Sequence, residues 1–190
     1  ILLIIIAIPF IKINFIDKFE YHGLEFQKTH LGQIEFFSTK FPVISNTGLV
    51  IGDYAVNLRN DPRKLEDIKV NVDNEDIVFN LIKKNNAIVY APTYISINPF
   101  MEICEDSGIS LLTVSSFLRD SGLNVSSAVT DKAYARTNNE THKWCDPINT
   151  VIVINSGNES IINQIQPYCY EIKFKDCEIM KVSERFILNI

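Results

Sequence analysis

The chain has 190 residues, of which 46% are hydrophobic and 22% are charged, and its formal net charge is −5. This length is enough for a domain whose core folds without a metal or a disulfide. A nucleic-acid partner is disfavoured, because binding phosphates requires a stripe of basic residues and the sequence has none.

The first sixteen residues are almost entirely apolar and rich in isoleucine, with Lys12 as their one charged residue. A complete membrane-spanning helix takes about 20 residues, and the chain begins with Ile rather than Met. We therefore expect residues 1–16 to be the outer end of a truncated membrane anchor, with the following domain on the extracytoplasmic side. Two alternatives stay open: a buried strand, or a hydrophobic strand donated to a neighbouring subunit.

Alternating apolar and polar residues follow this segment. They predict a β-hairpin over residues 19–43, with its turn at residues 27–32. A further strand over residues 53–60 should stop at Asn60-Asp61-Pro62, where Pro62 suits the first position of a helical turn. The next strand candidates are residues 68–72, 76–82 and 87–97, the last with a break at Pro92.

The middle of the chain predicts one long helix over residues 99–119, with Asn98 as its N-cap and Pro99 in its first position. Its apolar face would carry Phe100, Ile103, Cys104, Leu111, Leu112, Val114 and Leu118. A strand over residues 123–130 follows. The order strand, helix, strand predicts a crossover between two parallel strands.

The last third of the chain begins with a polar loop over residues 131–148. Three strands over residues 149–155, 160–165 and 168–174 would form a β-meander, joined by a turn at residues 156–158. Residues 177–190 predict an amphipathic helix. The elements together predict an α/β (α+β) fold: a mixed β-sheet with one long crossover helix and a C-terminal helix, preceded by the hydrophobic anchor.

The domain organisation follows from these elements. We expect residues 17–190 to form a single domain, because the sequence contains neither a low-complexity linker nor an internal repeat. Its β-rich part would cover residues 17–86 and its α/β part residues 87–190.

Four cysteines are present, and in an oxidising exterior they predict disulfides with three possible connectivities. We favour a Cys145–Cys169 bridge, because each residue lies just before a predicted strand and neighbouring strand starts lie within bridging distance. Cys104 and Cys177 would then pair or stay buried as thiols. His142 and Cys145 lack a second close pair of ligands, so we expect no metal and no cofactor.

Three Asn-X-Ser/Thr sequences are candidate glycosylation sites on a domain outside the membrane, and they begin at Asn124, Asn139 and Asn158. They agree with an exterior location, although a chain so rich in asparagine produces such sequences by chance.

Two clusters are candidate interfaces. Arg59, Asp61 and Arg63 form either an anion site or a structural turn with a local Asp–Arg contact, and the turn-forming residues favour the second interpretation. Trp144 lies in the polar loop, where it is either an interface anchor or a plug against the core beside a Cys145 disulfide.

Four stretches resemble a known type of protein when taken together: residues 54–65, 149–162, 169–172 and 177–187. They are similar to a recurring, uncharacterised type of membrane-anchored protein in archaeal genomes. The resemblance implies one hydrophobic segment followed by a single α/β domain. It carries no catalytic residue and no known activity.

The sequence contains no nucleophile elbow, P-loop or dinucleotide-binding motif. We therefore expect a non-enzymatic, membrane-anchored, extracytoplasmic domain that is a structural or binding subunit of a larger membrane or cell-surface assembly. Its partners would be the membrane, through residues 1–16, and other proteins or further copies of itself. Two alternatives stay open: a filament or pilus subunit that packs through its hydrophobic N-terminus, and an enzyme whose site forms only in space.

Overall fold

The computed structural model describes residues 18–44, 49–72 and 92–190. The chain divides into two compact units, residues 1–64 and residues 65–190. The described residues contain two β-sheets and three α-helices, so the predicted mixed α and β fold class is confirmed. The predicted anchor over residues 1–16 lies outside the described residues, and within those residues no helix combines the length and apolar character needed to cross a membrane.

The first unit is a four-stranded antiparallel sheet in which each strand pairs with the next one along the chain. The predicted turn at residues 27–32 is wrong, because the chain turns at His22-Gly23 and again at Gly32-Gln33. His22 and Gly23 both have positive φ angles, 50° and 77°, which suits a two-residue hairpin turn. The strands are β1 (Lys18–Tyr21), β2 (Leu24–Leu31), β3 (Ile34–Ile44) and β4 (Val50–Leu58).

One face of this sheet carries the buried side chains of the first unit. Phe26 and Leu58 are fully buried, and the ring of Phe19 stacks on that of Phe26 with centroids 5.6 Å apart. After β4 the chain forms a short 3-10 helix, η1 (Pro62–Lys64), with Pro62 in its first position as predicted.

The second unit contains a six-stranded mixed sheet in the order β5-β9-β10-β8-β6-β7. The strands β10, β8, β6 and β7 are mutually parallel, whereas β9 is antiparallel to β10 and parallel to β5. The bounds are β5 (Lys69–Asn71), β6 (Thr93–Ile97), β7 (Val125–Val129), β8 (Thr150–Ser156), β9 (Ile161–Gln166) and β10 (Cys169–Phe174).

The predicted β-meander at the end of the chain is wrong in its pairing, although its three strands exist. β10 lies between β8 and β9, so the turn expected at residues 156–158 does not join neighbouring strands. The residues Val151–Ile154 of β8 are fully buried, which is typical of a strand that is covered on both faces and paired at both edges. Placing β10 beside β8 supplies the second paired edge.

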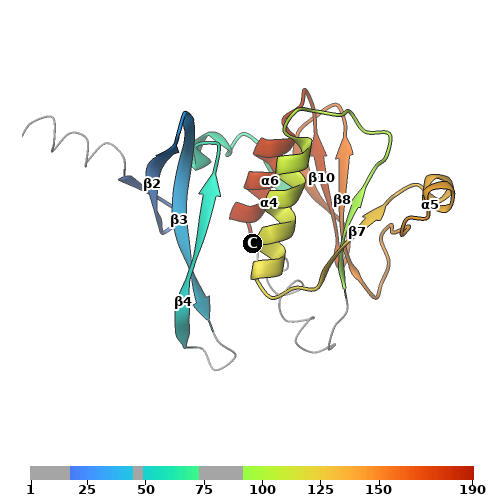
Figure 1. The fold of residues 1–190 in the computed structure, drawn as a ribbon, viewed down its shortest axis with the longest axis horizontal. Coiled ribbons are helices and arrows are strands. Elements are labelled where there is room, and N and C mark those ends of the chain that lie inside the picture. The colour runs from blue at the N-terminus through green and yellow to red at the C-terminus, as the bar shows by residue number, and fades with distance from the viewer. Residues whose placement is uncertain (1–17, 45–48, 73–91) are drawn as a thin grey trace, which may run out of the picture. The chain divides into compact units, whose positions relative to one another are not determined.

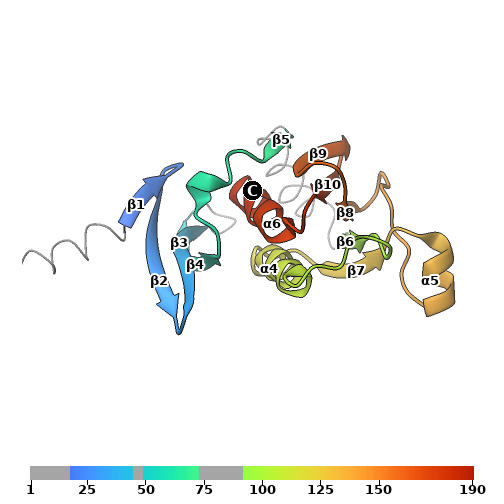
Figure 2. The same ribbon diagram turned by 90° about the horizontal axis from the view of Figure 1, so that it is seen from above.

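Two helices lie side by side on one face of the six-stranded sheet, α4 (Ser107–Asp120) and α6 (Ile179–Leu188) (Figures 1 and 2). The predicted C-terminal helix is therefore confirmed, and its buried Phe186 lies against the ring of Tyr170 in β10. The predicted parallel crossover is also confirmed, because α4 connects β6 to its parallel neighbour β7. The short helix α5 (Lys132–Asn138) lies on the other side of the sheet (Figure 1).

The long helix begins at Ser107, eight residues later than predicted. Asn98 does not cap a helix: its side-chain oxygen accepts the N–H of Phe100, and its amide group donates to Asn155 at 2.8 Å. Residues 98–106 form a loop in which Phe100 is 73% exposed and Ile103 is 91% exposed. The prediction that these two side chains belong to the apolar face of the helix is therefore wrong.

The predicted polar loop over residues 131–148 contains the helix α5, which was not predicted. The carboxylate of Asp131 accepts the N–H of Tyr134 at 2.7 Å and caps the first turn. Asn139 ends the helix in the left-handed conformation, with a φ angle of 55°. A helix of only seven residues is too short to show an apolar period, so these two caps were its only signal in the sequence.

Candidate functional site

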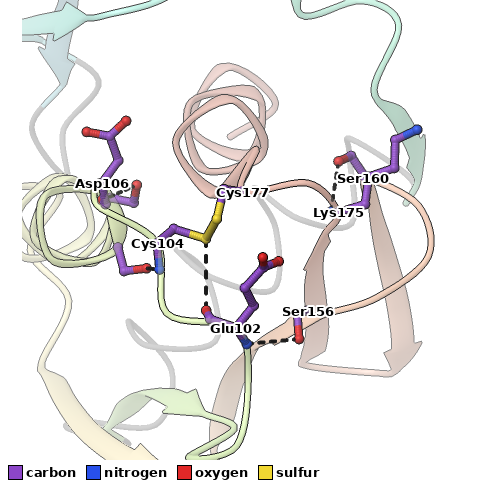
Figure 3. Close-up of a disulfide and its surroundings, with 9 residues drawn as sticks. Glu102, Cys104, Asp106, Ser156, Ser160, Lys175 and Cys177 are labelled. Carbon is purple, nitrogen blue, oxygen red and sulfur yellow. Dashed lines mark hydrogen bonds between the residues drawn. A yellow bond between two sulfur atoms is a disulfide. The ribbon is translucent and has the colours of Figure 1, made fainter.

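The carboxyl ends of β6, β8 and β10 meet at one edge of the six-stranded sheet, which is where ligands commonly bind in α/β folds. In this protein a disulfide between Cys104 and Cys177 lies at that edge (Figure 3). Their Cα atoms are 5.5 Å apart, and the bond joins the loop before α4 to the turn before α6. The prediction of disulfides is confirmed. For Cys104 and Cys177 the sequence allowed either a disulfide or two buried thiols, and the structure has the disulfide.

The same region holds the one group of potential metal ligands found among the described residues. Glu102 lies beside Cys104 and Cys177, with the three ligand atoms within 4.8 Å of one another (Figure 3). A cysteine binds zinc as its thiolate, and both sulfur atoms here are held in the disulfide. One exposed carboxylate then remains, which is too few ligands for a metal site.

Polar groups at this edge bond to one another. Besides the contact between Asn98 and Asn155, the backbone N–H of Glu102 donates to the hydroxyl of Ser156 at 3.2 Å (Figure 3). Together with the disulfide, these bonds fasten residues 98–106 to the strand ends. These residues therefore have a structural role at this edge: they hold the loop in place over the ends of the strands.

The second disulfide joins Cys145 to Cys169, which is the pairing favoured by the sequence, with Cα atoms 5.3 Å apart. It holds the loop after α5 against the face of the sheet opposite α4, where Cys169 is buried with Val151 and Val153. Trp144 is 44% exposed. It therefore does not plug the core as one of its two interpretations required.

Asp146 stabilises the same loop. Partial burial alone would raise the pKa of its carboxyl group, but hydrogen bonds from the side chain and N–H of Asn149 and from the N–H of Ile148 outweigh burial. The Lys143 ammonium, 3.2 Å away, acts in the same direction. The pKa of Asp146 is lowered to about 2, from 3.8.

This shift predicts an acid-sensitive contribution to stability. A carboxyl group whose pKa is lowered by folding stabilises the protein above its unfolded pKa, and that contribution disappears as the pH falls through the folded value. Asp146→Asn should therefore be less stable than the wild type at pH 5, with the difference shrinking between about pH 4 and pH 2. Urea unfolding of both proteins across this range measures the difference. Subtraction removes the parallel effects of Asp61 and Glu178, whose pKa values are also lowered. A constant difference down to pH 2 would contradict the assignment.

A groove of about 710 Å³ lies between α4 and the edge strand β7. Helix α4 supplies Leu111, Leu112, Ser115 and Arg119, and the sheet supplies much of the rest. Among the described residues, the lining set is Ile95, Ile97, Leu111, Leu112, Ser115, Arg119, Val125, Ser126, Ser127 and Thr141. It offers apolar surface, hydroxyl groups and one positive charge, which suits binding. None of these residues is a His, Cys, Asp or Glu that could activate a hydroxyl as a nucleophile.

The predicted arginine cluster forms a turn in the first unit. Arg63 donates two hydrogen bonds to the carboxylate of Asp61, at 2.9 and 2.6 Å, and its guanidinium lies 3.9 Å from the centroid of the Phe19 ring. The hydrogen bond from the Arg63 side chain is the main cause of the lowered pKa of Asp61. This arrangement matches the structural-turn interpretation for Asp61 and Arg63. Arg59 lies just after β4 and is half-buried.

The three candidate glycosylation sites all have exposed asparagines. Asn124 immediately precedes β7, Asn139 is the C-cap of α5, and Asn158 lies in the connection between β8 and β9. Each asparagine is therefore accessible to solvent.

The groove residues were not singled out by the sequence analysis. Leu111 and Leu112 were assigned to the buried face of a longer helix, and Ser126 and Ser127 were read only as part of a strand. The available signal was the pair of serines, which interrupts the apolar residues of this strand. Comparisons with protein families, with curated protein sequences and with solved structures gave no match.

Proposed function

We propose that this protein is a membrane-anchored, extracytoplasmic binding subunit of a larger membrane or cell-surface assembly and not an enzyme. The observation that carries the proposal is the groove between α4 and β7. Its described lining residues combine apolar walls and a single cation without acid–base groups. Such a surface binds a partner by burial and hydrogen bonding.

Two further observations support the exterior location. All four cysteines are paired, and disulfides persist in oxidising compartments and are rare in the reducing cytosol. The asparagines of all three glycosylation sequences are exposed. The membrane attachment rests on the composition of residues 1–16, because leaving an Ile or Leu side chain in water costs on the order of 1.5–3 kcal/mol each.

The anchoring part is tested by reconstitution. The full chain should float with liposomes in a density gradient, whereas a chain that lacks residues 1–16 should stay in the soluble fraction as a monomer. Electron microscopy of both preparations tests the filament alternative, which requires ordered polymers only when residues 1–16 are present. Flotation of the shortened chain would contradict anchoring through this segment.

The binding part is tested in native membranes with a photo-crosslinking amino acid placed at Leu112, in the groove, and at Ile148, outside it. These side chains are similarly exposed, 62% and 67%. A binding subunit should give a discrete crosslinked product from position 112 that is absent from position 148. Equal, diffuse labelling from both positions would contradict a binding role for the groove.

A further inference from the structure

We propose that the groove binds an extended segment of a partner polypeptide, which joins the sheet as an additional strand beside β7. The segment would place apolar side chains at alternate positions against α4 and an acidic side chain against Arg119. This inference rests on the proposed function and names the chemistry of the partner.

The backbone of β7 supports the addition of a strand at this edge. The carbonyl of Asn124 accepts the N–H of Thr93, and the N–H of Thr130 donates to the carbonyl of Ile97. Residues of a strand bond alternately to its two sides, so the even-numbered residues of β7 face β6. The N–H and C=O groups of Val125 and Ser127 therefore point away from the sheet. Such alternating donors and acceptors match another extended backbone.

The chain itself occupies the next position along this edge. The N–H of Val129 donates to the carbonyl of Thr141 at 2.9 Å, and the N–H of Lys143 donates to the carbonyl of Val129 at 3.0 Å. His142 thus forms an isolated parallel bridge with Val129. Within the described residues no other segment pairs with the outer edge of β7, so the open stretch is Val125–Ser127. A short added strand fits this length.

The side chains above the edge indicate what the added strand carries. The register places Val125 and Ser127 on the same face as Ile95, and this face is covered by α4. An added strand presents every second side chain to that face. Leu112, at 62% exposure, would then be covered by the apolar side chains of the partner. This explains a large apolar residue on the open side of α4.

Arg119 indicates the charge. It is the single charged residue among those lining residues that the structure describes, and it is itself exposed. In a chain of net charge −5, it forms no ion pair with any residue in the described ranges. Arginine binds a carboxylate through two parallel hydrogen bonds, so an acidic side chain is its natural partner.

A phage-displayed library of random dodecapeptides, selected on the full chain in detergent micelles, tests the inference. Selected peptides should share alternating apolar residues and at least one Asp or Glu. Their affinity should fall at least tenfold with Leu112→Arg, which fills the groove, and with Arg119→Glu, which reverses the charge. Ser127→Pro should have the same effect by removing an outward N–H. Ile148→Arg is the matched control, and it should bind like the wild type.

Enriched peptides that bind Leu112→Arg and Arg119→Glu as well as the wild type would overturn the inference, as would the absence of any enriched peptide. Leu112→Arg and Arg119→Glu change exposed side chains, so the test does not depend on whether Ser127→Pro folds. The outcome is separate from that of the crosslinking experiment. A crosslinked partner in native membranes without peptide binding would keep the binding function and reject only the strand-addition mode.

Discussion

Replacing Cys104 and Cys177 together with alanine should lower the free energy of unfolding by about 4.4 kcal/mol. The two residues are separated by 73 positions, and a bridge that closes so long a loop removes much conformational entropy from the unfolded chain. The bridge also ties the loop of residues 98–106 to the start of α6. Without it, this loop keeps its hydrogen bonds to β8 and the ring contact of Phe100 with Tyr134.

The second disulfide is the internal comparison. Cys145 and Cys169 are separated by 24 positions, so their joint replacement with alanine should cost about 3.4 kcal/mol in the same chain-entropy relation. Urea unfolding of the wild type and the two double variants gives the order of stability. A smaller loss from the Cys104 and Cys177 pair than from the Cys145 and Cys169 pair would contradict the entropic account.

The state of the cysteines in native material is a separate measurement. Alkylation without reduction, followed by mass spectrometry, should show two disulfides with these pairings. Four free thiols would contradict both disulfides, and the exterior location would then lose their support.

The sequence predicted those elements whose periodicity is strong. The apolar positions of α6 recur at helical spacing, and Val182 and Phe186 on that face are fully buried. The apolar run of β8 likewise predicted a strand. Its neighbours were not predictable from the run itself, because a fully apolar strand shows no preference between a hairpin partner and a parallel partner. The position of β10 between β8 and β9 depends on contacts that are distant in sequence.

The start of α4 shows why local signals can fail. Asn98-Pro99 is a good sequence pattern for a helix start, but Asn98 also initiates turns through its side chain. The structure takes the second option, with the Asn98 oxygen on the N–H of Phe100 and the disulfide at Cys104. The disulfide at Cys104 therefore outweighs the local preference of Asn98-Pro99 for starting a helix. As a consequence, Phe100 and Ile103 were predicted on the apolar face of the helix, although they lie exposed in the loop before it.

The candidate site was not predictable for a related reason. A groove beside an edge strand depends on which strand ends the sheet, and the sequence contains only the order of strands along the chain. Because β7 is the edge strand, Ser126 and Ser127 line the same groove as Arg119. The bridge between Cys145 and Cys169 was favoured because both residues lie just before predicted strands. The two strand starts are neighbours only through the parallel pairing of β10 with β8, which the sequence did not predict.

The two leucines of α4 provide the sharpest test of how this helix packs. Leu118 is 0% exposed, whereas Leu112 is 62% exposed and lines the groove. Leu118→Ala should lower the free energy of unfolding by roughly 2–5 kcal/mol, because it removes buried methyl groups and leaves a cavity between α4 and the sheet. Leu112→Ala makes the same chemical change on the same helix and should alter it by no more than about 0.5 kcal/mol.

Both variants are compared with the wild type by urea unfolding monitored through the far-ultraviolet circular dichroism. Because the change in helix propensity is identical, the difference between them isolates burial from local helix stability. Equal losses at the two positions would mean that Leu112 is covered in the isolated protein. The groove would then be closed in the absence of a partner, and the binding surface proposed above would have to be abandoned.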